Sequence, residues 1–214
     1  MRNSYRFLIA AASAIVGAAP LAAQAPNSGT VLHIAPYGGY MIFGNYLKGP
    51  LNSTLTNKPG LVYGTQVGLS LAPNLSLVGN VGYTATDIQV GLPFLGGVSV
   101  GHSSMLMYDA DLEYNLGSLG SSKEGSSMPI SPFVQAGVGA MRYTIDESIL
   151  QTNATNFAGN VGVGADLTLS RGMALRVLAK DYIGKFNFQD ATGLGISGET
   201  AHNFALTAGL RFDF

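Results

Sequence analysis

The chain has 214 residues, enough for one domain with a processed leader, and it is 47% hydrophobic but only 11% charged. A typical soluble domain has about 25% charged residues, so this chain is poorly supplied with side chains that keep a surface in water. The net charge of -1 argues against a nucleic-acid-binding protein, and the absence of cysteine excludes disulfides, thiolate metal sites and lipidated cysteines.

The first predicted element is a secretory signal peptide over residues 1–23. Arg2 and Arg6 precede an apolar run over residues 7–19, and small residues then favour cleavage after Ala23. The run is shorter than the about 20 residues that cross a bilayer as a helix, which makes a retained anchor the weaker alternative. The rest of the chain, residues 24–214, is predicted to be one domain and is therefore expected to be exported.

Segments that alternate apolar and polar residues then follow, with the period of two that is typical of β-strands. The eight predicted strands cover residues 31–43, 61–71, 75–86, 104–116, 132–143, 157–169, 173–183 and 202–214. One face of each strand is apolar, as in Leu106, Tyr108 and Leu112. The opposite face is mostly Gly, Ser, Thr and Asn with a few charges.

Two kinds of barrel match this alternation. A soluble lipocalin-like barrel points its apolar face inward, whereas an outer-membrane barrel points it at lipid and keeps a polar interior. The polar face has too little charge for a soluble surface. The sequence therefore predicts an all-β fold, an eight-stranded antiparallel up-and-down transmembrane β-barrel in the bacterial outer membrane.

The connections follow the rule for bacterial barrels, in which short periplasmic turns alternate with long extracellular loops. Short turns are predicted at residues 72–74 and 170–172, and long loops near residues 44–60, 87–103, 144–156 and 184–201. The Gly/Ser-rich connection 117–131 is long although it lies at the short-turn end, and we expect a flexible tether there. Both termini are then periplasmic and four loops are extracellular.

Charged residues on the polar faces are expected to meet inside the barrel. They are Asp109, Asp111, Glu113, Asp166, Arg176, Lys180 and Arg211. Because a charge inside a barrel is costly unless it is paired or wet, we favour an ion-pair network that plugs the lumen. A narrow charge-selective conduit and a metal site among the three acids of 109–113 are the alternatives.

Several segments resemble a known family. The closing LRFDF is similar to the C-terminal signal of outer-membrane proteins, and SPFVQAGVGAMRY and FAGNVGVGADLTLSRGMALRVLAKDY resemble strands of the small OmpA/OmpX/opacity-type barrels. The resemblance implies that Leu210, Phe212 and Phe214 are read by the barrel-assembly machinery. It also implies contact with outer-membrane lipid and lipopolysaccharide, and a possible extracellular protein or surface ligand. Since the sequence ends at Phe214, the peptidoglycan-binding domain of OmpA-type proteins is not expected.

The sequence contains three further features of possible chemical interest. His102 and Ser104 resemble the His-x-Ser pair of outer-membrane lipid A deacylases, but that family continues into Asn where this chain has Met105, and the nearest acids are Asp87 and Glu199. His33 and His202 are expected to be interfacial or lumen-rim residues with nothing organised around them. The Gly-x-Gly units at 137–139 and 162–164 lie in mid-strand, so we interpret them as spacing residues rather than nucleotide loops.

The sequence thus predicts a non-enzymatic outer-membrane protein that serves envelope structure and surface interaction. It predicts no catalytic residue, no cofactor, no metal site and no nucleic-acid partner. A narrow small-solute or ion channel is the alternative, and a lipid A-modifying enzyme is a weaker one.

Overall fold

The computed structural model describes residues 32–44, 47–48, 54–92, 96–119, 129–146, 151–187 and 197–214. The predicted signal peptide and residues 120–128 of the predicted tether lie outside the described residues.

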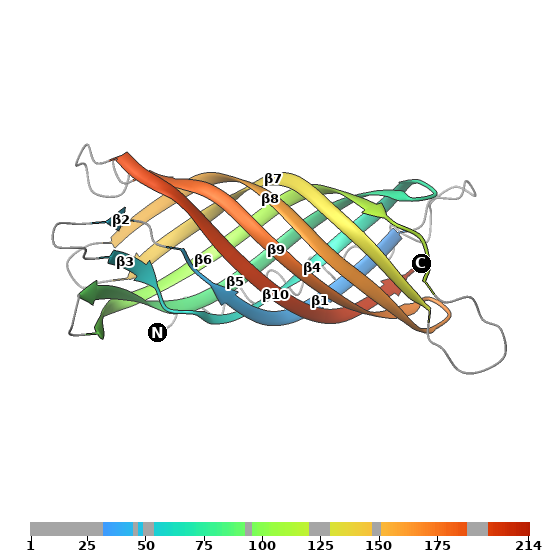
Figure 1. Ribbon diagram of the computed structural model, residues 1–214, viewed down its shortest axis with the longest axis horizontal. Coiled ribbons are helices and arrows are strands. Elements are labelled where there is room, and N and C mark those ends of the chain that lie inside the picture. Colours follow the sequence, from blue (N-terminus) through green and yellow to red (C-terminus); the bar gives the residue numbers. More distant parts are fainter. Residues whose placement is uncertain are drawn as a thin grey trace.

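Eight long antiparallel strands close into a barrel (Figure 1), which confirms the predicted fold class. Their bounds are β1 (Leu32–Ile42), β4 (Gly60–Ala72), β5 (Leu75–Leu92), β6 (Gly96–Asn115), β7 (Ile130–Asp146), β8 (Gln151–Ser170), β9 (Met173–Asn187) and β10 (Ser197–Asp213). Strands that are adjacent in this series pair with each other, and β1 pairs with β10 to close the barrel. No helix in the described part of the chain is long and apolar enough to cross a membrane.

Short turns and the C-terminus lie at one end of the barrel, opposite the small strands β2 (Leu47–Lys48) and β3 (Thr54–Asn57) (Figure 1). The turn between β8 and β9 consists of Arg171 and Gly172, and Gly172 has a φ of 75°. This left-handed conformation is one that glycine adopts without steric cost, which explains a two-residue reversal at this point.

The strands are longer toward the loop end than the sequence indicated. The segment 87–103 was predicted as a long loop that could extend the strands as a hairpin, and β5 and β6 do run through it in this way, with Leu92 paired to Gly96. The glycines of this segment weaken the alternation of apolar and polar residues, so the sequence does not clearly indicate a strand. The strands form because the backbone groups of each pair with those of its neighbour. A bilayer needs only about 9–11 tilted residues per strand. Strands of 18 and 20 residues are therefore longer than a bilayer requires.

Apolar side chains cover the outside of the barrel, as predicted. Val138 is 70% exposed and Phe157 is 87% exposed, and both point away from the axis. Along each strand, the residues that alternate with these exposed ones point inward. The charged and amide side chains among them are buried. The fold is thus inverted relative to a soluble barrel, with its polar groups toward the axis.

Candidate functional site in the barrel interior

The candidate site is the lumen, and strand alternation positions every side chain in it. Odd-numbered residues of β6 and β10 and even-numbered residues of β8 and β9 face the axis. This places all seven sequence-predicted charges inside: Asp109, Asp111, Glu113, Asp166, Arg176, Lys180 and Arg211. They form two clusters inside the barrel.

Arg176 is the centre of the cluster nearer the short turns. Its Nε and Nη2 donate to the two carboxylate oxygens of Asp166 at 2.8 Å each, and its Nη1 and Nη2 donate to the two oxygens of Glu113 at 2.9 and 3.0 Å. Nη1 also donates to the side-chain oxygen of Gln66 at 3.1 Å. All five N–H groups of the guanidinium therefore have acceptors. The ring of Phe133 lies 4.3 Å from the guanidinium carbon, which adds a cation–π contact.

Arg211 closes this cluster at the short-turn end. Its Nη1 donates to Asp166 at 2.7 Å, and its Nε donates to Asp213 at 2.8 Å. Asp166 therefore lies between two arginines, so neither of its oxygens lacks a donor.

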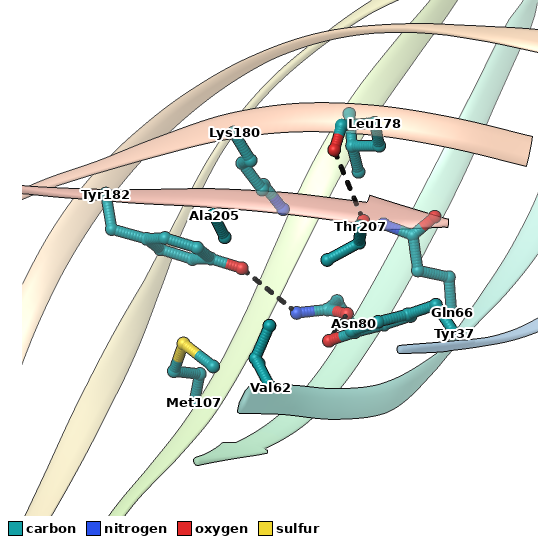
Figure 2. A pocket seen from close by; sticks show the side chains of 10 residues that line it. All are labelled: Tyr37, Val62, Gln66, Asn80, Met107, Leu178, Lys180, Tyr182, Ala205 and Thr207. Atoms are coloured by element: carbon teal, nitrogen blue, oxygen red, sulfur yellow. Dashed lines mark hydrogen bonds between the residues drawn. The ribbon is translucent and has the colours of Figure 1, made fainter. Parts of the chain in front are cut away.

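Lys180 forms the second cluster, near mid-barrel. Its ammonium group contacts Asp109 at 2.5 Å and also Asp111. The second oxygen of Asp109 accepts hydrogen bonds from Asn80 at 2.7 Å and from Tyr182 at 3.2 Å. Figure 2 shows Lys180 and Tyr182 of β9 and Asn80 of β5 around a small space inside the barrel. That cavity has a volume of about 10 Å³, roughly what one water molecule needs.

The loop-end half of the lumen contains an apolar cluster beside buried polar side chains, whereas a polar interior was predicted. Met41, Met105, Met107 and Met141 are at most 3% exposed and pack with Phe43, Val62 and Tyr143. A usable signal was present, because Met105 and Met107 have the same parity as the acids of β6. Methionine fills irregular space well, which suits it to packing inside the barrel next to the charged clusters.

Glycines make room for these side chains, in agreement with their interpretation as spacing residues. A Cβ on Gly137 would lie 2.1 Å from a carboxylate oxygen of Asp111, and one on Gly139 would lie 2.5 Å from the Cβ of Asp109. A Cβ on Gly164 would likewise lie 2.4 Å from a ring carbon of Phe133. The acids can lie across neighbouring strands only because these positions have no side chain.

One histidine lies elsewhere than predicted. His33 is not at the rim but wholly buried in the lumen, where neither ring nitrogen makes a hydrogen bond. On the outer wall, Nδ1 of His202 lies 2.8 Å from Asp181, and Nδ1 of His102 lies 2.7 Å from Asp87. Cross-strand register brings each acid to its histidine, a relation that a single strand's pattern cannot reveal.

His102 and Ser104 share the outer face of β6 near its loop end, and Asp87 is the acid that meets His102. In the described part of the chain, no group of three or more histidine, aspartate or glutamate side chains is arranged to hold a metal ion. The three acids of β6 are instead bound to Arg176 and Lys180.

The C-terminal residues complete the outer wall. Leu210 and Phe214 are 40% and 67% exposed on the outer face, with Phe212 between them. The N–H of Phe214 donates to the carbonyl of Leu32 at 2.8 Å, so the last residue of the sequence is joined to the first residue of β1.

Comparisons with known proteins agree with this fold. A family model, described as "Outer membrane protein beta-barrel domain", matches residues 8–212. A search of curated protein sequences found no match.

Solved structures are similar at low sequence identity. Neisserial surface protein A is 14% identical, with a TM-score of 0.56 over 87% of this chain and 100% of that one. OprG of Pseudomonas aeruginosa is 12% identical, with a TM-score of 0.54 over 87% and 96%. The N-terminal β-barrel domain of P. aeruginosa OprF is 16% identical, with a TM-score of 0.52 over 86% and 97%. At these identities the likeness concerns the fold alone.

Proposed function

The chain belongs to the outer membrane protein β-barrel family, and on that premise we propose that it is a non-enzymatic, non-conducting barrel of the bacterial outer membrane. One observation supports the proposal: two ion-pair clusters and the methionine cluster are buried inside the barrel. Eight strands enclose a space that side chains can fill, and the cavity at Lys180 holds about one water molecule.

The proposed topology has both termini in the periplasm and the long hairpins at the cell surface. The position of the short turns and the C-terminus at one end supports this arrangement. The hairpins and loops would then serve surface interaction, with an extracellular protein or other surface ligand as partner. The apolar outer wall would contact outer-membrane lipid and lipopolysaccharide.

Export and assembly complete the proposal. Residues 1–23 would be removed as a signal peptide during export. The assembly machinery would recognise Leu210, Phe212 and Phe214, and the outward position of the two exposed residues supports their accessibility.

Conductance across planar lipid bilayers tests the plug against the channel alternative. We expect no steady current from the wild-type barrel, with insertion checked by the gel mobility of the folded form. Steady, charge-selective openings that disappear when Arg176 or Lys180 is neutralised would overturn the plug and establish a narrow ion channel.

The pair of His102 and Asp87 favours one second candidate, an outer-wall hydrolase with Ser104 as nucleophile. A carboxylate can orient a histidine that serves as general base, and the 2.7 Å contact supports that geometry. Incubation with lipid A, followed by analysis of its acyl chains, tests this candidate. We expect no release; release that stops in Ser104→Ala but continues in Ser103→Ala would make the protein an enzyme.

A further inference from the structure

Basic side chains at the loop end of the barrel are paired with acids, with one exception among the side chains that the structure describes. The paired ones are Lys58 and His102, which share Asp87, and His202, which contacts Asp181. The exception is Arg142 on β7, which is exposed and has no acidic partner or hydrogen-bond acceptor among the described residues. The N–H donors of its guanidinium are therefore available to an anion from outside the chain.

Strand register places Arg142 just beyond two aromatic side chains of the outer wall. Tyr108 of β6 and Phe157 of β8 both pair with Ala140, and Arg142 lies on the same face of β7 two residues further toward the loops. Both aromatic side chains are exposed. In a transmembrane barrel, outward-facing aromatic residues gather where the acyl chains meet the headgroups. Arg142 is therefore expected at the level of the lipid phosphates.

A strongly exposed apolar surface lies next to Arg142 on its membrane side. Phe157 and Val138 are among the most exposed large apolar side chains of the described residues. They are diagonal neighbours, because Val138 pairs with Gly159, two residues along β8 from Phe157. A lipid whose headgroup meets Arg142 can therefore lay its acyl chains along this part of the wall.

The polar end of this surface suits a phosphate group. The planar fork of a guanidinium matches two phosphate oxygens and forms strong, charge-assisted hydrogen bonds with them. Thr155 pairs with Arg142 from β8 and is exposed on the same outer face, so its hydroxyl can donate to a third oxygen. The apolar wall below adds contacts that only a phosphate with acyl chains can use.

We propose that Arg142 and Thr155 bind the phosphate of one outer-leaflet lipid, whose acyl chains pack on Val138 and Phe157. This inference rests on the proposed function for the membrane location and for the loop end at the cell surface. It adds a binding site with a defined chemical group to what is otherwise a general contact between the wall and lipid.

Native mass spectrometry of the full chain, released from detergent micelles, tests the site. The probe is dimyristoyl phosphatidic acid, whose headgroup is a single phosphate. Dimyristoyl glycerol, which has the same acyl chains without the phosphate, is the comparison. We expect the wild-type barrel to retain one phosphatidic acid with at least about tenfold higher affinity than the diacylglycerol, because hydrogen bonds to a charged group contribute on that order. Equal affinity for the two lipids would overturn the proposal.

The variant Arg142→Gln should reduce the affinity for phosphatidic acid to that for the diacylglycerol. Arg171→Gln is the matched control, because it removes the same charge from an exposed position in the turn at the opposite end of the barrel, and it should retain the lipid as the wild type does. Since Arg142 is exposed, we expect the variant to fold, and the gel mobility of the folded form checks this. Retention that is unchanged in Arg142→Gln, or lost equally in both variants, would contradict the site.

Inorganic phosphate distinguishes a lipid from a free anion. At the concentration of the lipid it should not displace phosphatidic acid, because it makes no contact with the apolar wall; displacement would overturn the choice of a lipid as ligand. The test is separate from that of the proposed function. Lipid retention through Arg142 does not require a closed lumen, and a non-conducting barrel that retains no lipid would contradict this inference alone.

Discussion

At the scale of single residues, Arg176 joins several strands through its side-chain hydrogen bonds. Its five donors neutralise one acid from β6 and one from β8 and also reach Gln66 on β4. Three strands that are not neighbours in sequence are thereby joined through one side chain. Removing it would leave two buried carboxylates with too few donors.

We therefore expect Arg176→Met to lower the free energy of unfolding by about 3–5 kcal/mol, the cost of breaking a buried ion pair from one side. Urea titration of the barrel in lipid vesicles measures the change. Lys58→Gln provides the control, since Lys58 meets Asp87 at 3.6 Å on an exposed surface, where such a pair contributes at most about 1 kcal/mol. Similar losses in the two variants would contradict the role given to Arg176.

Glycine spacing leads to a second prediction at this scale. In Gly137→Ala the new methyl group would lie 2.1 Å from Asp111 and 2.2 Å from the carbonyl of Ala110. We expect a loss of about 1–3 kcal/mol in unfolding free energy from overpacking.

Gly159→Ala is the matched control on the outer face, where the nearest heavy atom is 4.0 Å from the new carbon. Its unfolding free energy should remain close to that of the wild type. If Gly137→Ala were as stable as Gly159→Ala, the lumen would be less tightly packed than the distances indicate.

At the scale of a strand, β8 shows how alternation divides one element between two environments. Asn156, Asn160 and Asp166 are buried in the lumen, while Phe157 and Val163 face outward. Phe157 and Leu169 lie near the two ends of the outer face, and Val163 lies halfway between them.

A charge at Val163 should therefore fall near the middle of the bilayer. We expect Val163→Lys to cost about 2–4 kcal/mol of unfolding free energy in lipid vesicles. Thr155→Lys, which is outward-facing but two residues beyond Phe157 toward the loops, should cost about 1 kcal/mol or less. Equal costs at the two positions would mean that the apolar band does not lie where the side chains place it.

At the scale of the whole molecule, the outer wall determines which solvent the barrel requires. Large apolar side chains are exposed on all eight barrel strands, among them Tyr40, Leu61, Val81, Leu112, Val138, Phe157, Val177 and Leu206. A continuous apolar exterior of this kind has no counterpart in soluble monomers, where contiguous patches rarely exceed about 300–600 Å².

We expect the protein to stay folded and monodisperse in detergent micelles and to aggregate when detergent is removed. Size-exclusion chromatography with circular dichroism before and after removal measures this. A folded, monodisperse barrel in plain buffer would refute the membrane assignment and everything argued from it.

Much of this architecture follows from local pattern. Alternation identified the eight barrel strands and their inner and outer faces, because a strand's side chains change sides at every residue whatever its partners are. The same parity indicated that the seven lumen charges point to one compartment. The true ends of β5 and β6 escaped it, because glycine-rich pairs such as Leu92 and Gly96 are held by hydrogen bonds to a partner strand rather than by side-chain pattern.

Sequence alone thus determined that this chain forms an inside-out barrel with charges toward its axis, since composition and parity are properties of each strand by itself. Only the tertiary structure decided which acid meets which cation and that four methionines cluster inside the loop-end half of the barrel. Those outcomes depend on the stagger between strands that are distant in sequence. A shift of one residue in any register would leave every strand's pattern unchanged but would send its charges to lipid.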